Sequence, residues 1–279
     1  MKISIAVASY NYGRFLDDCL GSLAAQNYPN FEVLIADGGS TDESLTIIER
    51  YCKSDSRFQL VSTQDKGQAD AIQKALSFAT GDIIGFLNAD DMYLCHDVFS
   101  AIVEAFDQYS RIGVISFAAW FVDEGGRSIK RVSHRQHPLD NLAWMKFRPQ
   151  IVQPATFWRR EVANSVPFHE KFHYVFDTVF FYQAYQKFSF LELPKPVAAY
   201  RLHGANKSVT VRSARVFELA QYERLKFGNS SIRASYLDFV GWIVRWCELY
   251  PLLGRPISKA IYLFVNTVSF LSFYRLPGI

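Results

Sequence analysis

The chain has 279 residues, of which 49% are hydrophobic and 20% are charged. This length allows one large domain, or one domain with an appendage. The composition predicts a sizeable core and argues against intrinsic disorder. The net charge of +3 is too small to indicate nucleic acid as a partner, and we expect none.

The cysteines and the start of the chain indicate a reducing compartment. Cys19, Cys52, Cys95 and Cys247 are far apart and show neither a CxxC motif nor the spacing of Cys and His metal ligands. We expect buried thiols. The first residues already have the pattern of a strand, so no signal peptide is expected. No uninterrupted run of about 18 apolar residues indicates a transmembrane helix. A cytoplasmic location is therefore expected.

Strand and helix patterns alternate four times within roughly the first 90 residues. The expected strands are residues 3–8, 31–36, 58–61 and 83–87. This alternation is typical of βαβ units with right-handed crossovers, and it predicts a Rossmann-like, mostly parallel sheet flanked by helices. Polar residues follow each strand, at Ser9, Asp37, 65–70 and 88–91. Open α/β sheets bind ligands at the carboxyl ends of their strands, so these residues should line a ligand crevice.

Two adjacent carboxylates, Asp90 and Asp91, follow the apolar strand at residues 83–87. Neighbouring carboxylates repel each other, and they are easiest to keep ionised when they share a hard cation such as Mg²⁺ or Mn²⁺. A bare pair of aspartates can instead be a polar turn or a helix cap. The chain has no GxGxxG after its first strand and no GxxxxGK[ST], which disfavours a dinucleotide site and a P-loop.

The second half of the chain mixes helices with further strands. We expect a helix over 97–109, a hairpin around 123–126, an aromatic helix over 172–187, and two short strands at 188–193 and 197–202. Beyond residue 211 helical segments dominate and are rich in aromatic and basic residues. This pattern is typical of helices at a membrane surface, but also of helices packed on the catalytic domain or on a second subunit.

Several motifs, in order, resemble the family 2 glycosyltransferases with the GT-A fold. They are Ser9-Tyr10-Asn11, Tyr28-Pro29, Asp37-Gly38-Gly39-Ser40-Thr41-Asp42, Asp65-Lys66-Gly67-Gln68, Leu87-Asn88-Ala89-Asp90-Asp91, Gln153-Pro154-Ala155-Thr156-Phe157 and Tyr200-Arg201 with His203. The resemblance covers about residues 2–208. It implies a GT-A domain over 1–210, with a nucleotide-sugar half (1–92) and an acceptor half (93–210). Residues 211–279 would form a helical, aromatic-rich C-terminal extension.

The resemblance implies inverting transfer of a sugar from a nucleotide diphosphate sugar to an acceptor hydroxyl, with a Mg²⁺ or Mn²⁺ cofactor. Asp91 is the leading metal ligand, and Asp90 would hold the donor ribose or share the metal. Asp37 would accept hydrogen bonds from the base. The donor-binding positions implied are Ala8, Ser9, Asn11, Asp37, Gly38, Lys66, Asp70, Asn88 and Asp90. For Asp65, Lys66 and Asp70, a solvated loop or a helix cap is an equally good interpretation.

The resemblance also implies a general base, since an inverting displacement must remove the acceptor proton. Asp177 aligns with it, and aromatic neighbours could raise its pKa; the alternative is a carboxylate favoured by the helix dipole. Val179 and the pair His169-Glu170 stand where the family often has acids, which makes Glu170 the reserve candidate.

His203 matches a histidine near the metal or the pyrophosphate in related enzymes, and imidazole suits Mn²⁺. A lone histidine is often structural instead. For Arg159, Arg160 and Arg201, surface salt bridges are the safer interpretation over phosphate contacts.

The resemblance and the interfacial pattern of the tail together indicate bacterial cell-surface polysaccharide or lipid-linked glycan synthesis. The acceptor would be a carbohydrate or lipid-linked, and the enzyme would work at the inner face of the cell membrane. Two alternatives remain: a nucleotidyltransferase and a non-catalytic sugar-nucleotide-binding protein.

Overall fold

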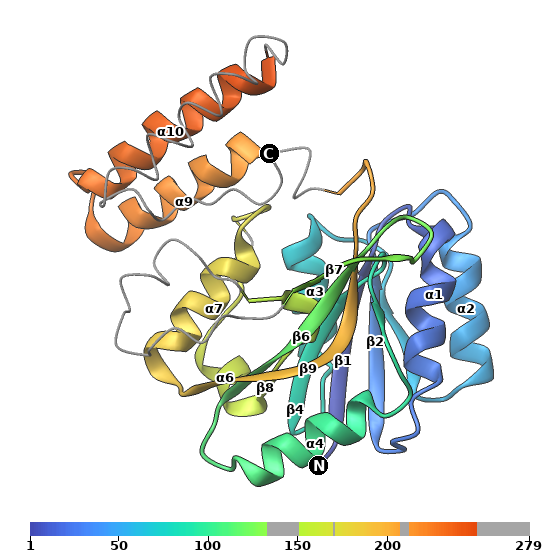
Figure 1. Cartoon of the computed structure of the whole chain (residues 1–279). Coiled ribbons are helices and arrows are strands. Elements are labelled where there is room, and N and C mark those ends of the chain that lie inside the picture. Colours follow the sequence, from blue (N-terminus) through green and yellow to red (C-terminus); the bar gives the residue numbers. More distant parts are fainter. Residues whose placement is uncertain (133–150, 170, 207–211, 250–279) are drawn as a thin grey trace. The chain divides into compact units, whose positions relative to one another are not determined.

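A computed structural model describes residues 1–132, 151–169, 171–206 and 212–249. The chain separates into two compact units (Figure 1). Among the described residues, the first unit comprises 1–132, 151–169 and 171–203, and the second comprises 204–206 and 212–249. The expected domain boundary at residue 210 stays a prediction.

The first unit alternates strands and helices along its amino-terminal half. Its elements are β1 (Ile3–Ser9), α1 (Gly13–Ala24), β2 (Phe31–Asp37), α2 (Ser44–Ser54), β3 (Phe58–Ser62), α3 (Gln68–Ser77), β4 (Ile83–Asn88), β5 (Met92–Tyr93), α4 (Val98–Gln108), β6 (Val114–Val122), β7 (Ser128–Val132), the 3-10 turn η1 (Gln153–Ala155), β8 (Thr156–Arg159), α6 (Arg160–Ser165), α7 (Phe176–Lys187) and β9 (Phe190–Arg201). The four predicted βα steps are all present.

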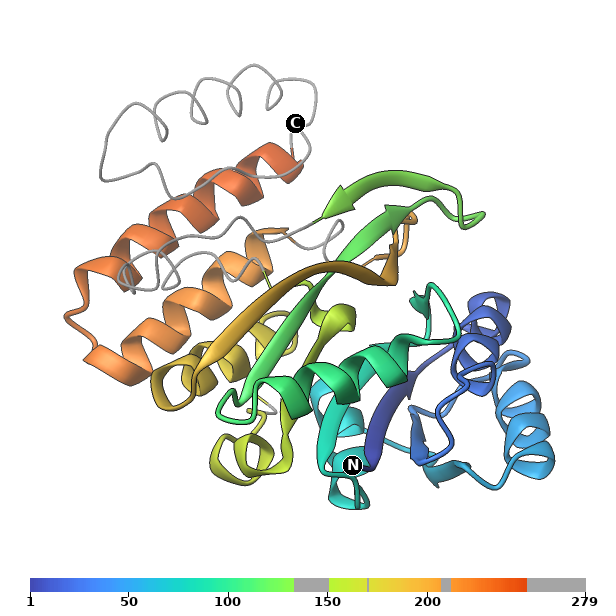
Figure 2. The same ribbon diagram turned by 60° about the horizontal axis from the view of Figure 1, so that its bottom comes forward.

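The described strands form one sheet in the order β3-β2-β1-β4-β8-β6-β9-β5, with β7 paired to β6. Strands β3, β2, β1 and β4 are parallel. Strand β8 is antiparallel to both of its neighbours, while β6 and β9 are parallel to each other. Figure 2 shows β6 and β9 lying side by side. The predicted α/β class with a mostly parallel sheet flanked by helices is confirmed.

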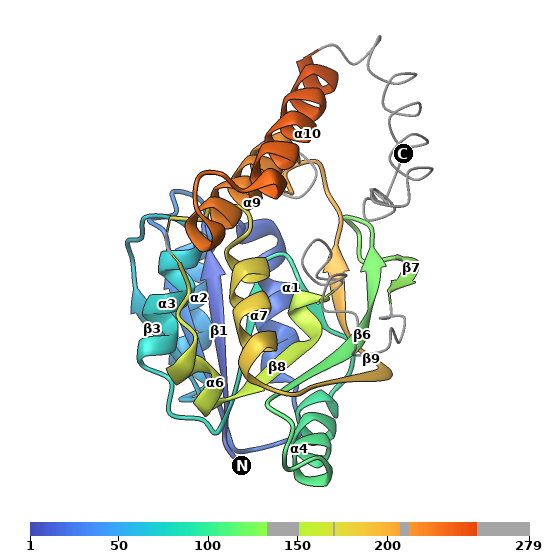
Figure 3. The ribbon, with the colours of Figure 1, turned by 90° about the vertical axis from the view of Figure 1, so that its left-hand side faces the viewer.

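Helices cover both faces of the sheet (Figure 3). On one face, α1, α2 and α4 share a single apolar core with the side chains of β1 and β2 that face these helices, such as Ile5 and Val33. On the other face, Phe86 of β4 packs against Phe168 and against Phe176 of α7. Because β1, β2 and β4 are buried on both sides, polar side chains that could meet a ligand lie at the ends of these strands.

Two predicted boundaries in the second half were wrong. The two short strands expected around Pro194 and Pro196 are one strand, β9, which pairs with β6 across register shifts beside Ala118. A proline lacks the N–H that a regular ladder needs, and an irregular register removes that need. The aromatic helix begins at Phe176 rather than at Phe172, because a turn closed by the Phe172 N–H and the His169 carbonyl precedes it.

The second unit contains two described helices, α9 (Arg212–Phe227) and α10 (Ile232–Leu249). They pack on each other through a small apolar cluster that includes Val216, Ala220 and Leu237. Gly241 permits this approach, because a Cβ there would lie 2.7 Å from the Phe217 ring. Within the described ranges, no helix has both the length and the hydropathy needed to cross a bilayer.

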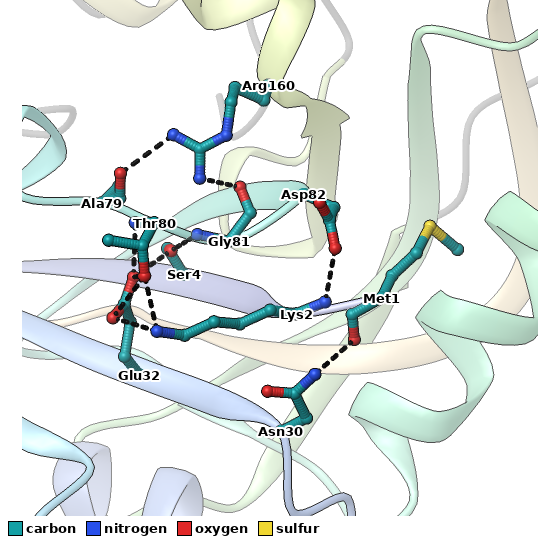
Figure 4. A network of polar contacts seen from close by, with 10 residues as sticks. All are labelled: Met1, Lys2, Ser4, Asn30, Glu32, Ala79, Thr80, Gly81, Asp82 and Arg160. Atoms are coloured by element: carbon teal, nitrogen blue, oxygen red, sulfur yellow. Dashed lines mark hydrogen bonds and ion pairs between the residues drawn. The ribbon is translucent and has the colours of Figure 1, made fainter.

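A polar network ties β1, β2 and the turn before β4 together at the amino ends of the strands (Figure 4). Glu32 is buried and accepts hydrogen bonds from Lys2 and Ser4, each at 2.6 Å. The Thr80 N–H also donates to it, at 2.6 Å. Burial alone would raise the pKa of Glu32, but these donors outweigh it and lower the pKa to about 2. The ionised form therefore stabilises the fold.

Replacing Glu32 by Gln should lower the free energy of unfolding at pH 7 by about 1 to 3 kcal/mol, since charged hydrogen bonds of a buried group are lost. The folded pKa lies below the unfolded value, so this contribution is present at neutral pH and is lost as pH falls from about 4.5 toward 2. Urea unfolding between pH 7 and about pH 2 measures it. The control is Glu49→Gln, since Glu49 pairs with Lys53 on the surface. Equal effects of the two variants would contradict the network's role.

Candidate active site

The carboxyl ends of β1 and β2 are joined through the Asp37 loop. The Asp37 carboxylate is fully buried and accepts hydrogen bonds from the Gly39 and Ser40 N–H groups at 3.0 and 2.7 Å, and from the Ser40 hydroxyl at 2.7 Å. The Gly38 N–H donates to the Ser9 carbonyl at 2.8 Å. Gly39 has a φ of +87°, which glycine adopts without strain. Asp37 therefore shapes this loop, and its contact with a base stays a prediction.

Asn11 links this loop to the start of α1. Its backbone has a φ of 55°, which places its N–H 2.8 Å from the Ser40 hydroxyl. Its side-chain oxygen accepts from the Thr41 N–H at 2.8 Å. The predicted donor positions Ser9, Asn11, Asp37 and Gly38 are thus brought together in one structure.

The segment before α3 approaches the same loop. A Cβ on Gly38 would lie 2.8 Å from the Asp65 carboxylate, so a larger residue there would require the Asp65 side chain to move. Asp65 holds the Gly67 N–H at 2.7 Å. Asp70 accepts from the Lys66 N–H at 2.8 Å and pairs with Lys74 at 2.9 Å. Asp70 therefore bonds the turn before α3 and pairs with Lys74, and its predicted place on the donor side stays a prediction.

His203 lies beside Asp90, although the two residues are far apart in the sequence. Its Nε2 is 3.0 Å from Asp90 Oδ2, and the His203 side chain is fully buried. The imidazole packs edge-on against Tyr12 and at 4.8 Å from the Phe15 ring. The sequence predicted both residues for the site, and the structure places them in direct contact.

Asp91 is held at both of its carboxylate oxygens. The Arg201 N–H donates to Oδ1 at 2.9 Å, and the Asn88 amide donates to Oδ2 at 3.3 Å. Burial raises the pKa of Asp91 well above its usual range, and the charge of Asp90 raises it further. Burial raises the pKa of Asp90 as well, opposed by the hydrogen bond from His203. Such a pair calls for a proton or a cation to balance its charge.

The three arginines expected to form surface salt bridges bind mainly to backbone carbonyls. Arg159 donates to the carbonyls of Ile112 and Phe106, at 3.0 and 2.7 Å. Arg160 donates to the Ala79 and Gly81 carbonyls. The expectation was therefore wrong for both, because these two side chains, at the end of the short β8, lie beside main-chain carbonyls of other segments rather than beside carboxylates.

Arg201 is the most buried of these arginines, with 2% of its surface exposed. It donates to the Asp90 carbonyl at 2.9 Å and the Glu124 carbonyl at 2.7 Å, and it pairs with Asp18 at 2.6 Å. Its guanidinium also lies over the Phe15 ring, at 4.8 Å. Arg201 thus belongs to the framework that holds the acid pair, rather than to the surface.

Asp177 lies in the first turn of α7, where its carboxylate accepts the Thr178 N–H at 2.6 Å. The neighbouring Phe176 packs on Phe86, with ring centroids 6.1 Å apart. This contact fastens the start of α7 to β4, the strand that ends just before Asp90. The reserve candidate Glu170 lies outside the described residues.

The chemistry of Asp90, Asp91 and His203 suits a divalent cation. In the part of the chain that the structure describes, no three His, Cys, Asp or Glu side chains form a ready cage for a metal ion. A Mg²⁺ site does not require one, since Mg²⁺ is often held by one or two carboxylates together with substrate phosphates. The residues present therefore fit a cation that binds together with a phosphorylated donor.

The sheet order and the acidic residues at the strand ends are typical of α/β proteins that bind ligands, often nucleotides, at the carboxyl ends of their strands. The sequence model of glycosyl transferase family 2 matches residues 4–192, so the chain belongs to this family and is a glycosyltransferase. The family predicted from the motifs is confirmed.

Curated relatives are also named as glycosyltransferases. An uncharacterized glycosyltransferase of Nostoc sp. is 29% identical over 228 residues, which cover 77% of this chain and 69% of the relative. The putative glycosyltransferase EpsH of Bacillus subtilis is 31% identical over 123 residues, or 44% of this chain and 36% of EpsH. The chain thus matches only about a third of EpsH.

Solved structures share the fold. TarS of S. aureus, in complex with UDP-GlcNAc, has a TM-score of 0.63 at 20% identity, over 85% of this chain and 70% of that one. A mannosyltransferase from Pyrobaculum calidifontis, in complex with GDP-Man and Mn²⁺, has a TM-score of 0.62 at 18% identity, over 98% and 81%. At these identities the likeness concerns the fold.

Proposed function

We propose that this enzyme transfers a sugar, with inversion, from a nucleotide diphosphate sugar to an acceptor hydroxyl, in a reaction that depends on a divalent cation. The observation that carries the proposal is the buried acid pair, Asp90 and Asp91, at the carboxyl end of β4. Donor-bound structures of similar fold, with UDP-GlcNAc and with GDP-Man and Mn²⁺, support this choice of donor.

The donor would lie against the loops that follow β1, β2 and β4. The main chain at Ala8 and Ser9, with Asn11, Asp37 and Gly38, would receive the nucleoside. The Lys66 side chain would approach the phosphates. Asn88 and Asp90 would face the ribose and the sugar. The support is that hydrogen bonds link Ser9, Asn11, Gly38 and Asp37 to one another or to their shared loop.

Asp91, Asp90 and His203 are the residues that would hold Mg²⁺ or Mn²⁺. When bound, the cation would neutralise the charge that develops on the diphosphate leaving group. Asp90 and His203 would supply one carboxylate oxygen and one imidazole nitrogen, which are hydrogen-bonded to each other at 3.0 Å in this structure and would exchange that hydrogen bond for the cation. Arg201 would keep Asp91 in place through its backbone N–H.

Asp177 would act as the general base that takes the proton of the acceptor hydroxyl. Its place in the first turn of a helix fastened to β4 supports this role. Family membership favours glycosyl transfer over the alternative of nucleotidyl transfer. Metal-dependent hydrolysis of the donor would separate an enzyme from a sugar-nucleotide-binding protein without activity.

Replacing Asp91 by Asn should abolish Mn²⁺-dependent binding of a nucleoside diphosphate, since a neutral amide is a weaker ligand than a carboxylate. Calorimetric titration of a panel of nucleoside diphosphates, with and without Mn²⁺, measures this binding. It also identifies the nucleobase that the donor site prefers. The control is Asp97→Asn, an exposed aspartate paired with Lys195. Binding that ignores both Mn²⁺ and Asp91 would mean that the acid pair is structural.

Replacing Asp177 by Asn should lower kcat by about 10²- to 10⁴-fold and leave donor affinity nearly unchanged, because a general base acts on the acceptor in the transition state. Steady-state kinetics of transfer, or of donor hydrolysis, give both quantities. The matched control is Glu161→Gln, since Glu161 is an exposed acid in the first turn of α6. If the two variants lose activity equally, Asp177 is not the base.

We also propose that the enzyme associates with the inner face of a bacterial cell membrane and acts on a carbohydrate or lipid-linked acceptor in cell-surface glycan synthesis. Phe239, Trp242, Trp246 and Leu249 are exposed by 63, 63, 37 and 66%, at helical spacing along α10. Arg245 lies beside Trp242, at 5.7 Å from its ring. Residues 250–279 add three basic residues and no acidic ones. Aromatic and basic residues together favour an anionic lipid surface.

Replacing Trp242 and Trp246 by Ser should reduce sedimentation with vesicles that contain anionic lipid, because the aromatic side chains no longer insert at the lipid surface. The control is Leu225→Ser, an exposed apolar side chain on α9. Unchanged sedimentation of the double variant would contradict membrane binding through α10. Concentration-dependent dimers in the wild type without lipid binding would assign this surface to a second copy instead.

A further inference from the structure

Three side-chain amides form a hydrogen-bonded chain next to the acid pair. The Gln153 amide nitrogen donates to the Phe86 carbonyl at 2.6 Å. The Gln153 oxygen accepts from the Asn88 amide at 3.1 Å, and the Asn88 oxygen accepts from Gln68 at 2.6 Å. The second contact of the Asn88 nitrogen is Asp91 Oδ2, at 3.3 Å. These hydrogen-bonded amides thus connect η1, β4 and α3 to Asp91.

The Phe86 carbonyl fixes the direction of this chain. A carbonyl can only accept, so the Gln153 nitrogen must face it, and the Gln153 oxygen must face Asn88. The Asn88 amide must then direct its nitrogen toward Gln153 and Asp91, and its oxygen toward Gln68. Its two N–H groups are both used in this arrangement. A flipped Asn88 would place its oxygen against the Asp91 carboxylate, which is repulsive.

The Asp91 carboxylate is therefore oriented from two sides. On one side the backbone N–H of Arg201, at the end of β9, holds Oδ1. On the other side Asn88 holds Oδ2, and Gln153 holds Asn88. Gln153 is 7% exposed, so water has little access to replace its hydrogen bonds.

We infer that Gln153 is a positioning residue for the cation and donor site, because through Asn88 it sets the orientation of the Asp91 carboxylate. This inference rests on the proposed function, in which Asp91 is a ligand. The motifs that contain Gln68 and Gln153 thereby gain a role in positioning Asp91. Neither glutamine is among the residues proposed to bind the donor or to act as the general base. Partners that orient a metal ligand typically change metal affinity by about 10- to 100-fold when they are replaced.

The test is Gln153→Met, which keeps the length of the side chain and removes both of its hydrogen bonds. The Asn88 amide then loses its acceptor and is free to rotate away from Asp91. The Mn²⁺ concentration that supports half-maximal binding of a nucleoside diphosphate should rise by about 10- to 100-fold. Calorimetry gives this value without any turnover. Electron paramagnetic resonance of free Mn²⁺ gives an independent reading.

The matched control is Gln26→Met. Gln26 is also buried, and its amide is bound in the same way: it donates to the Cys95 and Ser22 carbonyls at 2.7 and 3.0 Å and accepts from the Phe99 N–H at 3.1 Å. Both variants lose a buried amide and should lose comparable stability. Only the Gln153 variant should change the Mn²⁺ requirement. A purely structural role of Gln153 would make the two variants behave alike.

A second variant covers the case in which Gln153→Met does not fold. Gln153→Glu keeps the size and the oxygen that faces Asn88, but it loses the donor to the Phe86 carbonyl, and it should also raise the Mn²⁺ requirement. Suppose that the wild type binds nucleotide with Mn²⁺, and that the folded Gln153 variants need a Mn²⁺ concentration within twofold of the wild-type value for half-maximal binding. The inference is then wrong and the proposed function stands. If the wild type itself shows no Mn²⁺-dependent binding, both are wrong.

Discussion

Two buried carboxylates side by side are the constraint on which the rest of the first unit depends. Asp91 is 1% exposed and Asp90 8%, and both have pKa values raised by burial. Like charges in a poorly solvated place repel each other and favour the neutral form. Asp90 and Asp91 are surrounded by groups that favour the charged form instead: the Arg201 N–H, the Asn88 amide and the His203 ring.

These groups come from distant parts of the chain, so the sheet order is what assembles the site. The strand β9 must reach the end of β4 for Arg201 and His203 to lie beside Asp90. It does so by running parallel to β6 for most of its length and by pairing with β5, the two-residue strand directly after Asp91. Arg201 then bonds Asp90, Glu124 and Asp18 at once. Arg201 therefore holds three segments of the chain together, and removing a buried arginine with several partners is costly in free energy.

The sequence predicted the parts of this site that follow from local patterns. Apolar runs that end in Asp37 and Asp90 predicted strands whose carboxyl ends meet, and the structure confirms the strands. The sequence could not show that Asp90 and His203 touch, since no local pattern links residues 113 positions apart. Resemblance to a family supplied His203 as a candidate, and the fold supplied its partner.

Apart from the start of the aromatic helix, the errors of the sequence analysis share one cause: tertiary contacts override local signals. Prolines at 194 and 196 indicated a break, but an irregular register let one strand pass through them. The arginines were expected at the surface because arginine usually lies there, yet Arg201 is buried under charged and backbone partners. The resemblance included Gln153 in a motif but implied no role for it. Its hydrogen bonds to Phe86 and Asn88 join η1 to β4, two elements that are far apart in the sequence.

The central claim is that the acid pair at the end of β4 holds a cation together with the diphosphate of a donor. The most direct measurement is the electron paramagnetic resonance signal of free Mn²⁺, titrated with protein in the presence and absence of a nucleoside diphosphate. The account predicts that the free signal falls strongly only when protein and nucleotide are both present. It also predicts that Asp90→Asn combined with Asp91→Asn restores the signal. If the double variant lowers the free Mn²⁺ signal as much as the wild type does, the account is contradicted.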